Sequence, residues 1–393
     1  MIRSMLGVAT SAPSRGLFLR PASQAGAAAL FLSLVACGGG GGGYSSNTTP
    51  PPPPPSYQVS NLVSDQAAVG AATTDTNLVN AWGLAYGPTT DFWVANQATA
   101  TATVYDGLGH RPTVPLVISV PLMAGHVMVG PTGQVFNGTT GFLGDEFMVA
   151  SLEGCICGWS AGTTMTRRVD NSTSNATYTG LAMGTNGTAS FLYAANLSAG
   201  TVDVFDSTYA PVSMGATAFV DPTLPAGFSP YNVSVLGGQL YVTYAKKDPA
   251  ALRESTGAGL GYVSLFGLDG TFVRRVASAG SLNAPWGLAM APASFGTFAS
   301  ALLVGNFGDG HITAFNATTG AMLGQLSDAN SAPLAISGLW GMTFGNGASA
   351  GYSNQLYVTA GPQAETHGLF ATISYGPPAG TGGTGGTGGG LGY

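Results

Sequence analysis

The sequence predicts an all-β fold, and three observations carry that prediction. A short motif recurs six times, at steps of 47 to 55 residues. Each copy is followed by further short apolar runs separated by turns that contain Gly, and apolar residues at helical spacing are missing throughout. Four strands in a period of this length are typical of a propeller blade. We therefore predict a six-bladed β-propeller of four-stranded blades.

The recurring motif is expected to form the first strand of each blade. It is clearest at Ala81–Ala85 (AWGLA), Pro285–Ala289 (PWGLA) and Leu339–Thr343 (LWGMT). Weaker copies occupy residues 131–135, 178–182 and 230–234. Its third position falls at 83, 133, 180, 232, 287 and 341, which sets the register of the six repeats.

The remaining strands follow each motif in the same order. A second apolar run such as Phe92–Asn96 comes next, then a third such as Gly310–Asn316, and a fourth such as Thr271–Val276 closes the unit. The sixth unit ends with its third strand, at 367–375, while an unmatched strand lies at Tyr57–Val63. We expect this N-terminal strand to pair with the last blade and close the ring, which leaves no long unpaired edge.

The N-terminus predicts export. Arg3, Arg15 and Arg20 precede an apolar segment at Ala25–Ala36 that is too short to cross a bilayer as a helix, as in a signal peptide. The segment runs into Leu34-Val35-Ala36-Cys37, which resembles the bacterial lipobox. The resemblance implies cleavage before Cys37 and lipidation of its thiol. An ordinary secretory signal followed by an incidental cysteine is the alternative.

These features predict four segments. Residues 1–36 form the signal peptide, 37–56 a lipidated tether rich in Gly and Pro, 57–376 the propeller, and 377–393 a disordered tail rich in Gly and Thr. We expect an exported protein, lipid-anchored in the bacterial cell envelope. We expect the outer membrane, because no signal for retention in an inner membrane follows Cys37.

Charge is unusually scarce in this chain. Only 7% of the residues are charged, and the net charge is −6 without any basic cluster. Nucleic acid is therefore not an expected partner, because phosphate binding needs concentrated Lys and Arg. The pairs Arg167-Arg168 and Arg274-Arg275 are expected to be strand residues that face solvent. Cys155 and Cys157 lack zinc-ligand spacing, and a disulfide between them would be strained, so we expect free, packed thiols.

One set of equivalent positions is expected to line the channel. The register brings together Trp82, Thr132, Thr179, Tyr231, Trp286 and Trp340. Two interpretations remain open for this column. The aromatic rings could stack on a sugar or another flat ligand, or they could pack between blades, as repeated aromatic residues do in propellers.

A second set of equivalent positions lies at the ends of the second strands and comprises Asn96, Ser151, Asn196 and Asn306. Calcium-dependent gluconolactonases are also six-bladed, but a calcium site needs carboxylate ligands, which this column lacks. Hydrogen bonds to the following turns are the expected role. The acids nearest to predicted loops do not share equivalent positions; they are Asp75, Asp145, Glu146, Asp309 and Glu365. We therefore predict no catalytic residues, no metal ligands and no cofactor.

Motifs at both ends of the predicted propeller resemble one family. Residues 61–66 (NLVSDQ), 75–85 (DTNLVNAWGLA), 135–139 (VFNGT) and 367–370 (HGLF) are similar to an uncharacterised bacterial family catalogued with PEP-CTERM sorting systems, which has a relative in a giant virus. The resemblance covers nearly all of 58–376. It implies a six-bladed propeller of the NHL-like or TolB-like kind and no established activity. The chain lacks the C-terminal Pro-Glu-Pro motif of that family.

Two functions from different classes remain open. The first is a non-enzymatic binding or scaffolding lipoprotein that recognises a glycan, a peptide or an envelope protein through one propeller face. The second is a metal-dependent lactonase or hydrolase, and calcium is expected only in that case. The absence of convergent reactive groups in the sequence favours the first.

Overall fold

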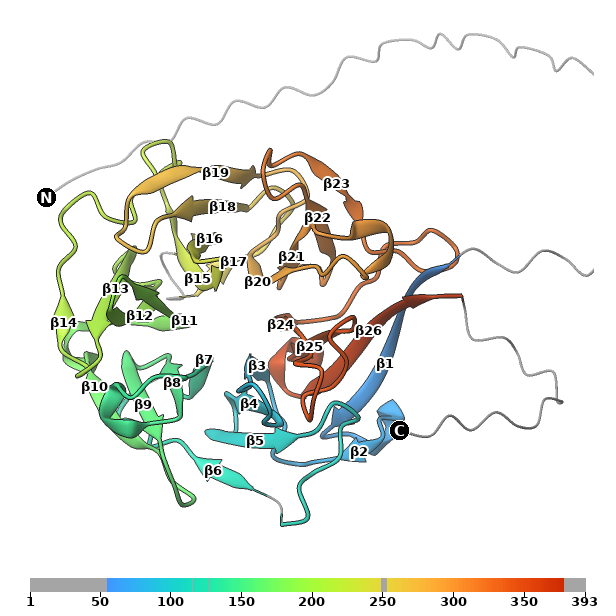
Figure 1. The fold of residues 1–393 in the computed structure, drawn as a ribbon, viewed down its shortest axis with the longest axis horizontal. Coiled ribbons are helices and arrows are strands. Elements are labelled where there is room, and N and C mark those ends of the chain that lie inside the picture. The colour runs from blue at the N-terminus through green and yellow to red at the C-terminus, as the bar shows by residue number, and fades with distance from the viewer. Residues whose placement is uncertain (1–54, 115, 127, 249–252, 378–393) are drawn as a thin grey trace, which may run out of the picture. The chain divides into compact units, whose positions relative to one another are not determined.

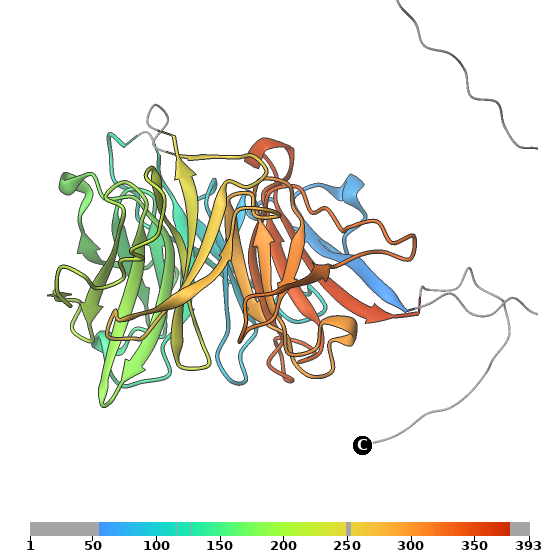
Figure 2. The same ribbon diagram turned by 90° about the horizontal axis from the view of Figure 1, so that it is seen from above.

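Six sheets arranged in a ring around a channel form the protein (Figure 1). The structure is a computed structural model that describes residues 55–114, 116–126, 128–248 and 253–377. Each sheet contains four antiparallel strands ordered from the channel outward, and two of the sheets carry one additional short strand. The six-bladed β-propeller predicted from the repeats is confirmed. Figure 2 shows the strands running between the two faces of the ring.

The first three blades follow one another along the chain without a crossover. From the channel outward, their strands are β3 (Ala81–Ala85), β4 (Phe92–Asn96), β5 (Thr101–Tyr105) and β6 (Val117–Ser119); β7 (Pro131–Phe136), β8 (Phe147–Ser151), β9 (Cys155–Trp159) and β10 (Thr166–Asp170); and β11 (Tyr178–Asn186), β12 (Ala189–Asn196), β13 (Thr201–Asp206) and β14 (Pro211–Val212).

The next two blades repeat the pattern, and blade 4 adds β17 beside β16. Their strands are β15 (Phe228–Leu236), β16 (Gln239–Lys247), β17 (Glu254–Ser255), β18 (Gly261–Phe266) and β19 (Phe272–Ser278); and β20 (Pro285–Met290), β21 (Leu302–Asn306), β22 (Ile312–Phe315) and β23 (Met322–Gln325). Four 3₁₀ turns lie in connecting loops of the described chain, at Ala67–Val69, Phe142–Gly144, Ser172–Ser174 and Gly296–Phe298.

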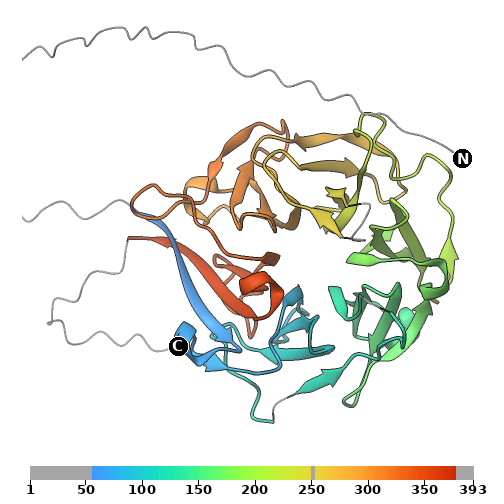
Figure 3. The same ribbon diagram turned by 180° about the vertical axis from the view of Figure 1, so that it is seen from behind.

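Blade 6 joins the two ends of the described chain. It consists of β24 (Leu339–Phe344), β25 (Leu356–Ala360), β26 (Leu369–Gly376), β1 (Ser56–Ser64) and β2 (Thr73–Thr74). Strand β1 pairs antiparallel with β26 from Ser56 opposite Gly376 to Ser64 opposite Leu369, so the N-terminal strand closes the ring as predicted. The blue β1 and the red β26 lie side by side in Figures 1 and 3.

Side-chain contacts hold this closure in register. Asp65, which follows β1, accepts a hydrogen bond from the backbone N–H of Gly368 and lies 2.6 Å from Nδ1 of His367. Tyr57 packs between the rings of Phe298 and Tyr375 and donates a hydrogen bond to the carbonyl oxygen of Phe295. The closing strand is therefore bonded to blade 6 and packed against blade 5.

The glycine of the recurring motif lets the inner strands approach one another. A Cβ atom on Gly83 would overlap the carbonyl oxygen of Thr132 in the next blade, and one on Gly133 would overlap the backbone nitrogen of Leu181. The same relation links Gly341 to Trp82, across the closure. Equivalent positions thus meet around the ring, so the inner strands run in the same direction and in the same register.

Apolar side chains are buried mainly between the blades. Among the described residues they form six clusters, one at each interface between neighbouring blades, and a seventh cluster fills the channel. Each blade therefore stabilises its two neighbours, which is the expected energetics of a repeat protein closed on itself.

The two arginine pairs lie on strands, as predicted, but the expectation that they face solvent is wrong for Arg168 and Arg275. These two side chains are 21% and 16% exposed, and each binds a carboxylate with no exposed surface, Asp145 and Asp221 respectively. A buried carboxylate needs a cation and hydrogen bonds to offset the loss of water. The arginines turn inward because they supply both.

Cys155 and Cys157 are free and buried, as expected. Burial raises the pKa of the two thiols to about 11 and about 12, which keeps them protonated at neutral pH. The predicted signal peptide, Cys37 with almost all of the tether, and the C-terminal tail at 378–393 lie outside the described residues. In the part of the chain that is described, no helix is long and apolar enough to cross a membrane.

Candidate functional site

The six predicted channel residues are all buried and pack against protein groups. The Trp82 and Trp340 rings stack with centroids 3.6 Å apart, and Trp286 meets both rings edge-on at about 6 Å. Tyr231 lies against Trp340, with centroids 6.1 Å apart. These rings fill the channel instead of packing between blades, and at this depth their faces are covered.

The two threonines of the column take part in hydrogen bonds between blades. Thr132 donates a hydrogen bond to the carbonyl oxygen of Tyr178 in the next blade at 2.8 Å. The carbonyl oxygen of Thr179 accepts a hydrogen bond from Nε1 of Trp286, on the far side of the channel. The column therefore ties blades to one another across and around the channel.

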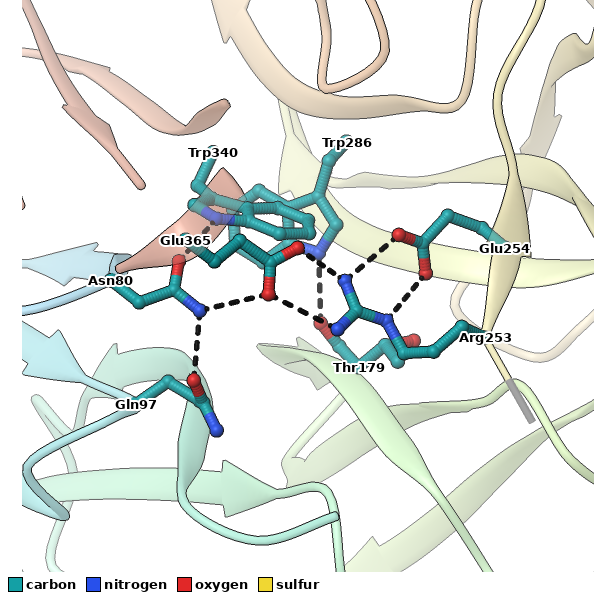
Figure 4. Close-up of polar contacts among 8 residues, drawn as sticks. All are labelled: Asn80, Gln97, Thr179, Arg253, Glu254, Trp286, Trp340 and Glu365. Atoms are coloured by element: carbon teal, nitrogen blue, oxygen red, sulfur yellow. Dashed lines mark hydrogen bonds and ion pairs between the residues drawn. The ribbon is translucent and has the colours of Figure 1, made fainter. Parts of the chain in front are cut away.

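A polar cluster covers the aromatic rings at one mouth of the channel. Arg253, which directly precedes β17 in blade 4, reaches to Glu365 in blade 6 (Figure 4). Its guanidinium donates to both carboxylate oxygens of Glu365, at 3.1 and 2.5 Å, and to both oxygens of Glu254, at 3.0 and 2.9 Å. The guanidinium carbon also lies 6.0 Å from the centroid of the Trp82 ring. One cation thus holds two carboxylates above the packed rings of Trp82, Trp286, Trp340 and Tyr231, which we call the aromatic plug.

An amide chain extends this cluster into blade 1. Nδ2 of Asn80 donates to Glu365 at 3.2 Å and to Oε1 of Gln97 at 2.8 Å (Figure 4). Oδ1 of Asn80 accepts the Nε1–H of Trp340, which links the polar layer to the rings below. We call Arg253, Glu254, Glu365, Asn80 and Gln97 the mouth cluster. Its members come from blades 1, 4 and 6.

The turn that carries Glu365 has an unusual backbone. Gln363, Ala364 and Glu365 lie in succession in the left-handed region, with φ of 54°, 54° and 67°. Each such non-glycine residue costs about 1–2 kcal/mol, so the turn persists only where neighbouring contacts enforce it. The contacts of Glu365 with Arg253 and Asn80 are of that kind. Strained backbone of this sort is typical of functional sites.

The two carboxylates of the mouth cluster are both paired with Arg253 and are not free bases. Burial acts to lower the pKa of Arg253, but the hydrogen bonds that it donates to Glu365 and Glu254 outweigh this effect and raise the pKa. Burial, followed by the negative charge of Glu254, raises the pKa of Tyr231 far above its usual value. Arg253 is 26% exposed and Glu365 is 20% exposed, whereas Glu254 is 3% exposed. Arg253 and Glu365 are therefore the charged groups of the cluster that a ligand reaches.

The second predicted column has a structural role. The side-chain oxygen of Asn196 accepts hydrogen bonds from Ser198 and from the backbone of Ala199 in the following turn. Asn306 donates to Asp309 in its own turn, and Ser151 bonds the backbone of Cys155. Asn96 donates to Thr101 and Thr103 on β5. Within the described ranges, no three His, Cys, Asp or Glu side chains are placed to hold a metal ion.

Sequence reasoning missed Arg253, Glu254 and the pairing of two acids through Arg253. Glu365 was singled out, but no sequence repeat connects it to residue 253, since 112 residues separate the two. A local signal was present, because residues 246–254 contain five charged residues in a chain of which only 7% is charged. A charge concentration in one inter-strand segment of one blade is a departure from the repeat, and such departures are where functional groups are expected.

Comparisons with known proteins find relatives in a giant virus. No family model matches the chain. An uncharacterized protein of Acanthamoeba polyphaga mimivirus is 34% identical over 340 residues, covering 81% of this chain and 80% of the viral protein. Another from the same virus is 30% identical over 341 residues, covering 81% and 86%. Among solved structures, an auxiliary nutrient binding protein from Bacteroides thetaiotaomicron is similar with a TM-score of 0.50 at 11% identity, covering 82% of this chain and 77% of that one. At that identity the likeness concerns the fold alone.

Proposed function

The chain belongs to the family of these two mimivirus proteins, and from that premise we propose that it is a non-enzymatic binding module that recognises its ligand at the mouth cluster. The ligand class is a glycan, a peptide or another envelope protein. A glycan fits the cluster best, because paired carboxylates, a guanidinium and amides are the groups that bond to sugar hydroxyls.

The observation that carries this proposal is the position of Arg253 between Glu254 and Glu365. A hydrolase would need a free carboxylate as a base or a carboxylate pair open to a cation. Here the guanidinium already occupies the space between the two carboxylates. The carboxylate of Glu365, held by Arg253 and Asn80, still reaches solvent. A charged surface that is preorganised and partly exposed to solvent favours a role in ligand recognition over one in catalysis.

The alternative is a metal-dependent lactonase or hydrolase of the six-bladed propeller class. It requires a divalent cation to displace Arg253 from the two carboxylates. Titration of the purified protein with calcium chloride in a calorimeter tests this directly. We expect no saturable heat. Stoichiometric calcium binding that is lost in the Glu365→Gln variant would reverse the ranking of the two functions.

A glycan array tests the binding proposal. Wild-type protein, Glu365→Gln and Glu146→Gln are compared on the same array. Glu146 is exposed and lies just before β8, the second strand of blade 2, on the opposite face of the ring, so it provides a matched control. We expect glycans that bind the wild type to bind Glu365→Gln at least about tenfold more weakly, a loss of about 1.4 kcal/mol. Equal binding by the two variants would refute recognition at the mouth cluster.

We further propose that Cys37 is lipidated and displays the propeller at a bacterial cell envelope, in the outer membrane. The support is the sequence of the export signal and lipobox. Cells that express the wild type should incorporate labelled palmitate into the protein, and Cys37→Ala should abolish the label. Globomycin should also cause a larger precursor to accumulate. An unlabelled wild type would rule the anchor out.

A further inference from the structure

A cavity lies at the end of the channel opposite the mouth cluster. Its volume is about 290 Å³, and the ends of the inner strands β3, β7, β11, β15 and β24 form its walls. Asn80 of the mouth cluster precedes β3, whereas Tyr86, which lines this cavity, follows β3. The two sites are thus at opposite ends of the same strands, with the aromatic plug between them.

The walls of this cavity are uncharged. Phe136, Leu181 and Met183 are among its apolar lining residues, and Ser234 and Thr343 add hydroxyl groups. No Asp, Glu, Lys, Arg or His contributes to the lining within the part of the chain that the structure describes. An ion would lose its hydration here without gaining a counter-charge. The cavity therefore suits a neutral ligand.

Gln134, at the wall of this cavity, has an unpaired buried amide that points to a ligand. This residue lines the cavity and is only 6% exposed, yet neither Oε1 nor Nε2 of its side chain has a hydrogen-bond partner in the described protein. Buried amides are almost always paired, because an unpaired one destabilises the fold. The equivalent positions in the other five blades are all apolar; they are Leu84, Leu181, Val233, Leu288 and Met342. Packing alone thus favours an apolar residue at position 134, and the amide calls for another explanation.

We propose that this cavity binds an uncharged ligand through an amide group, which pairs with the amide of Gln134. A secondary amide offers a carbonyl oxygen to Nε2 and an N–H to Oε1, so both unpaired atoms are satisfied together. The two atoms are covered in this structure. To reach the ligand they must turn by rotation about the last two side-chain torsions, and because neither atom is bonded to protein, this rotation breaks no hydrogen bond.

The size of the cavity limits the ligand. Small-molecule sites usually span about 300–1,000 Å³, so this one takes a small molecule or the terminal group of a larger one. The acetamido group of an N-acetylated sugar and the amide of a short neutral peptide share the required chemistry. In either case the alkyl part of the ligand contacts Phe136 and Met183, while the amide contacts Gln134. This inference does not depend on the proposed function of the mouth cluster.

Nuclear magnetic resonance on the ¹⁵N-labelled protein tests the proposal. The side-chain NH₂ signals of Gln134 are assigned by their disappearance in Gln134→Leu, which carries the residue found in three other blades. The probes are N-acetylglucosamine, N-acetylalanine N-methylamide and, as a sugar without an amide, glucose. We expect one of the two amide probes to shift the Gln134 signals saturably and glucose to leave them unchanged. The probe that acts distinguishes a sugar from a peptide source.

The variants separate binding from stability. Gln134→Leu should weaken binding of the active probe at least about tenfold, and its Tm should rise because the unpaired amide is gone. Glu365→Gln, at the other mouth, should bind the probe as the wild type does. The proposal is overturned if neither amide probe shifts the Gln134 signals, if glucose shifts them equally, or if Gln134→Leu binds the probe unchanged. A raised Tm without probe binding would mark Gln134 as a packing defect only.

Discussion

At the scale of single residues, close approach between blades explains the most regular feature of the sequence. The glycine at the third position of the motif recurs in five of the six copies, and the remaining copy, in blade 4, has Asn232 there. A methyl group on Gly133 would overlap both Leu181 and Gly180 of blade 3. The inner strands would have to separate to admit it, and the rings packed in the channel would lose contact.

Gly133→Ala should therefore lower the free energy of unfolding by about 1–3 kcal/mol, the usual cost of overpacking a well-packed site. The matched control is Gly138→Ala. A Cβ at Gly138 would make only one ordinary contact, 3.5 Å from the Phe136 ring. Its effect should stay within about 0.5 kcal/mol. Urea denaturation of both variants measures the difference, and equal effects would contradict the close-approach explanation.

Also at the residue scale, the buried carboxylate of Asp221 makes the stability of the protein depend on pH. Burial acts to raise the pKa of Asp221, but hydrogen bonds from Arg275 and Ser264 outweigh it and lower the pKa to about 2. The usual value for Asp in unfolded chains is about 3.9. Since the folded pKa is the lower one, the carboxylate stabilises the protein above about pH 4. That contribution is lost as the pH falls toward 2.

Asp221→Asn should lower the free energy of unfolding by about 3 kcal/mol at pH 7, because it leaves Arg275 without its counter-charge. The difference from wild type should shrink steadily between pH 4 and pH 2. Urea denaturation at a series of pH values follows both quantities. Glu146→Gln, which removes an exposed carboxylate, should track the wild type throughout. A difference that does not change with pH would contradict the assignment.

At the scale of elements, strand β1 depends on one aromatic anchor. Tyr57 is 3% exposed and contacts Phe295, Phe298 and Tyr375 from blades 5 and 6. Its hydroxyl donates to the backbone of Phe295. Val59 on the same strand is 39% exposed. A substitution at Tyr57 therefore tests the side-chain packing of β1, whereas one at Val59 leaves that packing in place and tests the pairing with β26.

Tyr57→Ala should destabilise the protein by about 3–5 kcal/mol, as large-to-small changes at buried aromatic residues do. Val59→Ala, in the same pairing with β26, should cost less than about 1 kcal/mol. Thermal unfolding followed by circular dichroism ranks the two variants. If they prove equal, β1 is held by its backbone hydrogen bonds and not by the anchor.

Elements that repeat, and the strand that completes the last repeat, could be predicted from the sequence, whereas additions to a single blade could not. The inner strands were found at every copy of the motif, because each one packs against an equivalent neighbour and so retains the same residues. Strand β17 and the strained turn at Pro362–Glu365 occur in one blade each. Arg253 beside β17 and Glu365 in the turn meet across the channel, and this contact does not follow from the repeat. Membership of the bacterial family with PEP-CTERM systems and lipidation of Cys37 stay predictions.

At the scale of the whole molecule, the ring has no unique starting point. Ser56 and Gly376 are paired neighbours in one blade, so the two ends of the propeller already lie together. Every blade contacts its two neighbours through an apolar cluster of its own. The order in which the blades occur along the chain is therefore less important than their order around the ring.

A circular permutant should test this independence. Residues 376 and 56 are joined by a short Gly/Ser linker, and new termini are opened between β14 and β15, in the loop between blades 3 and 4. We expect the same circular dichroism spectrum and a Tm within about 5 °C of wild type, because only one loop connection is exchanged for another. A permutant that does not fold would show that one connection between blades 3 and 4 is essential.

The same closure has a consequence in time. Ser64 is synthesised early, and its hydrogen-bond partner Gly368 comes 304 residues later. At about 5–20 residues per second, roughly 15 to 60 seconds pass between the two. Throughout this interval the edge of β1 that faces β26 has no native partner. The period during which this edge is open to aggregation is therefore no shorter than the time needed to synthesise the residues between Ser64 and Gly368.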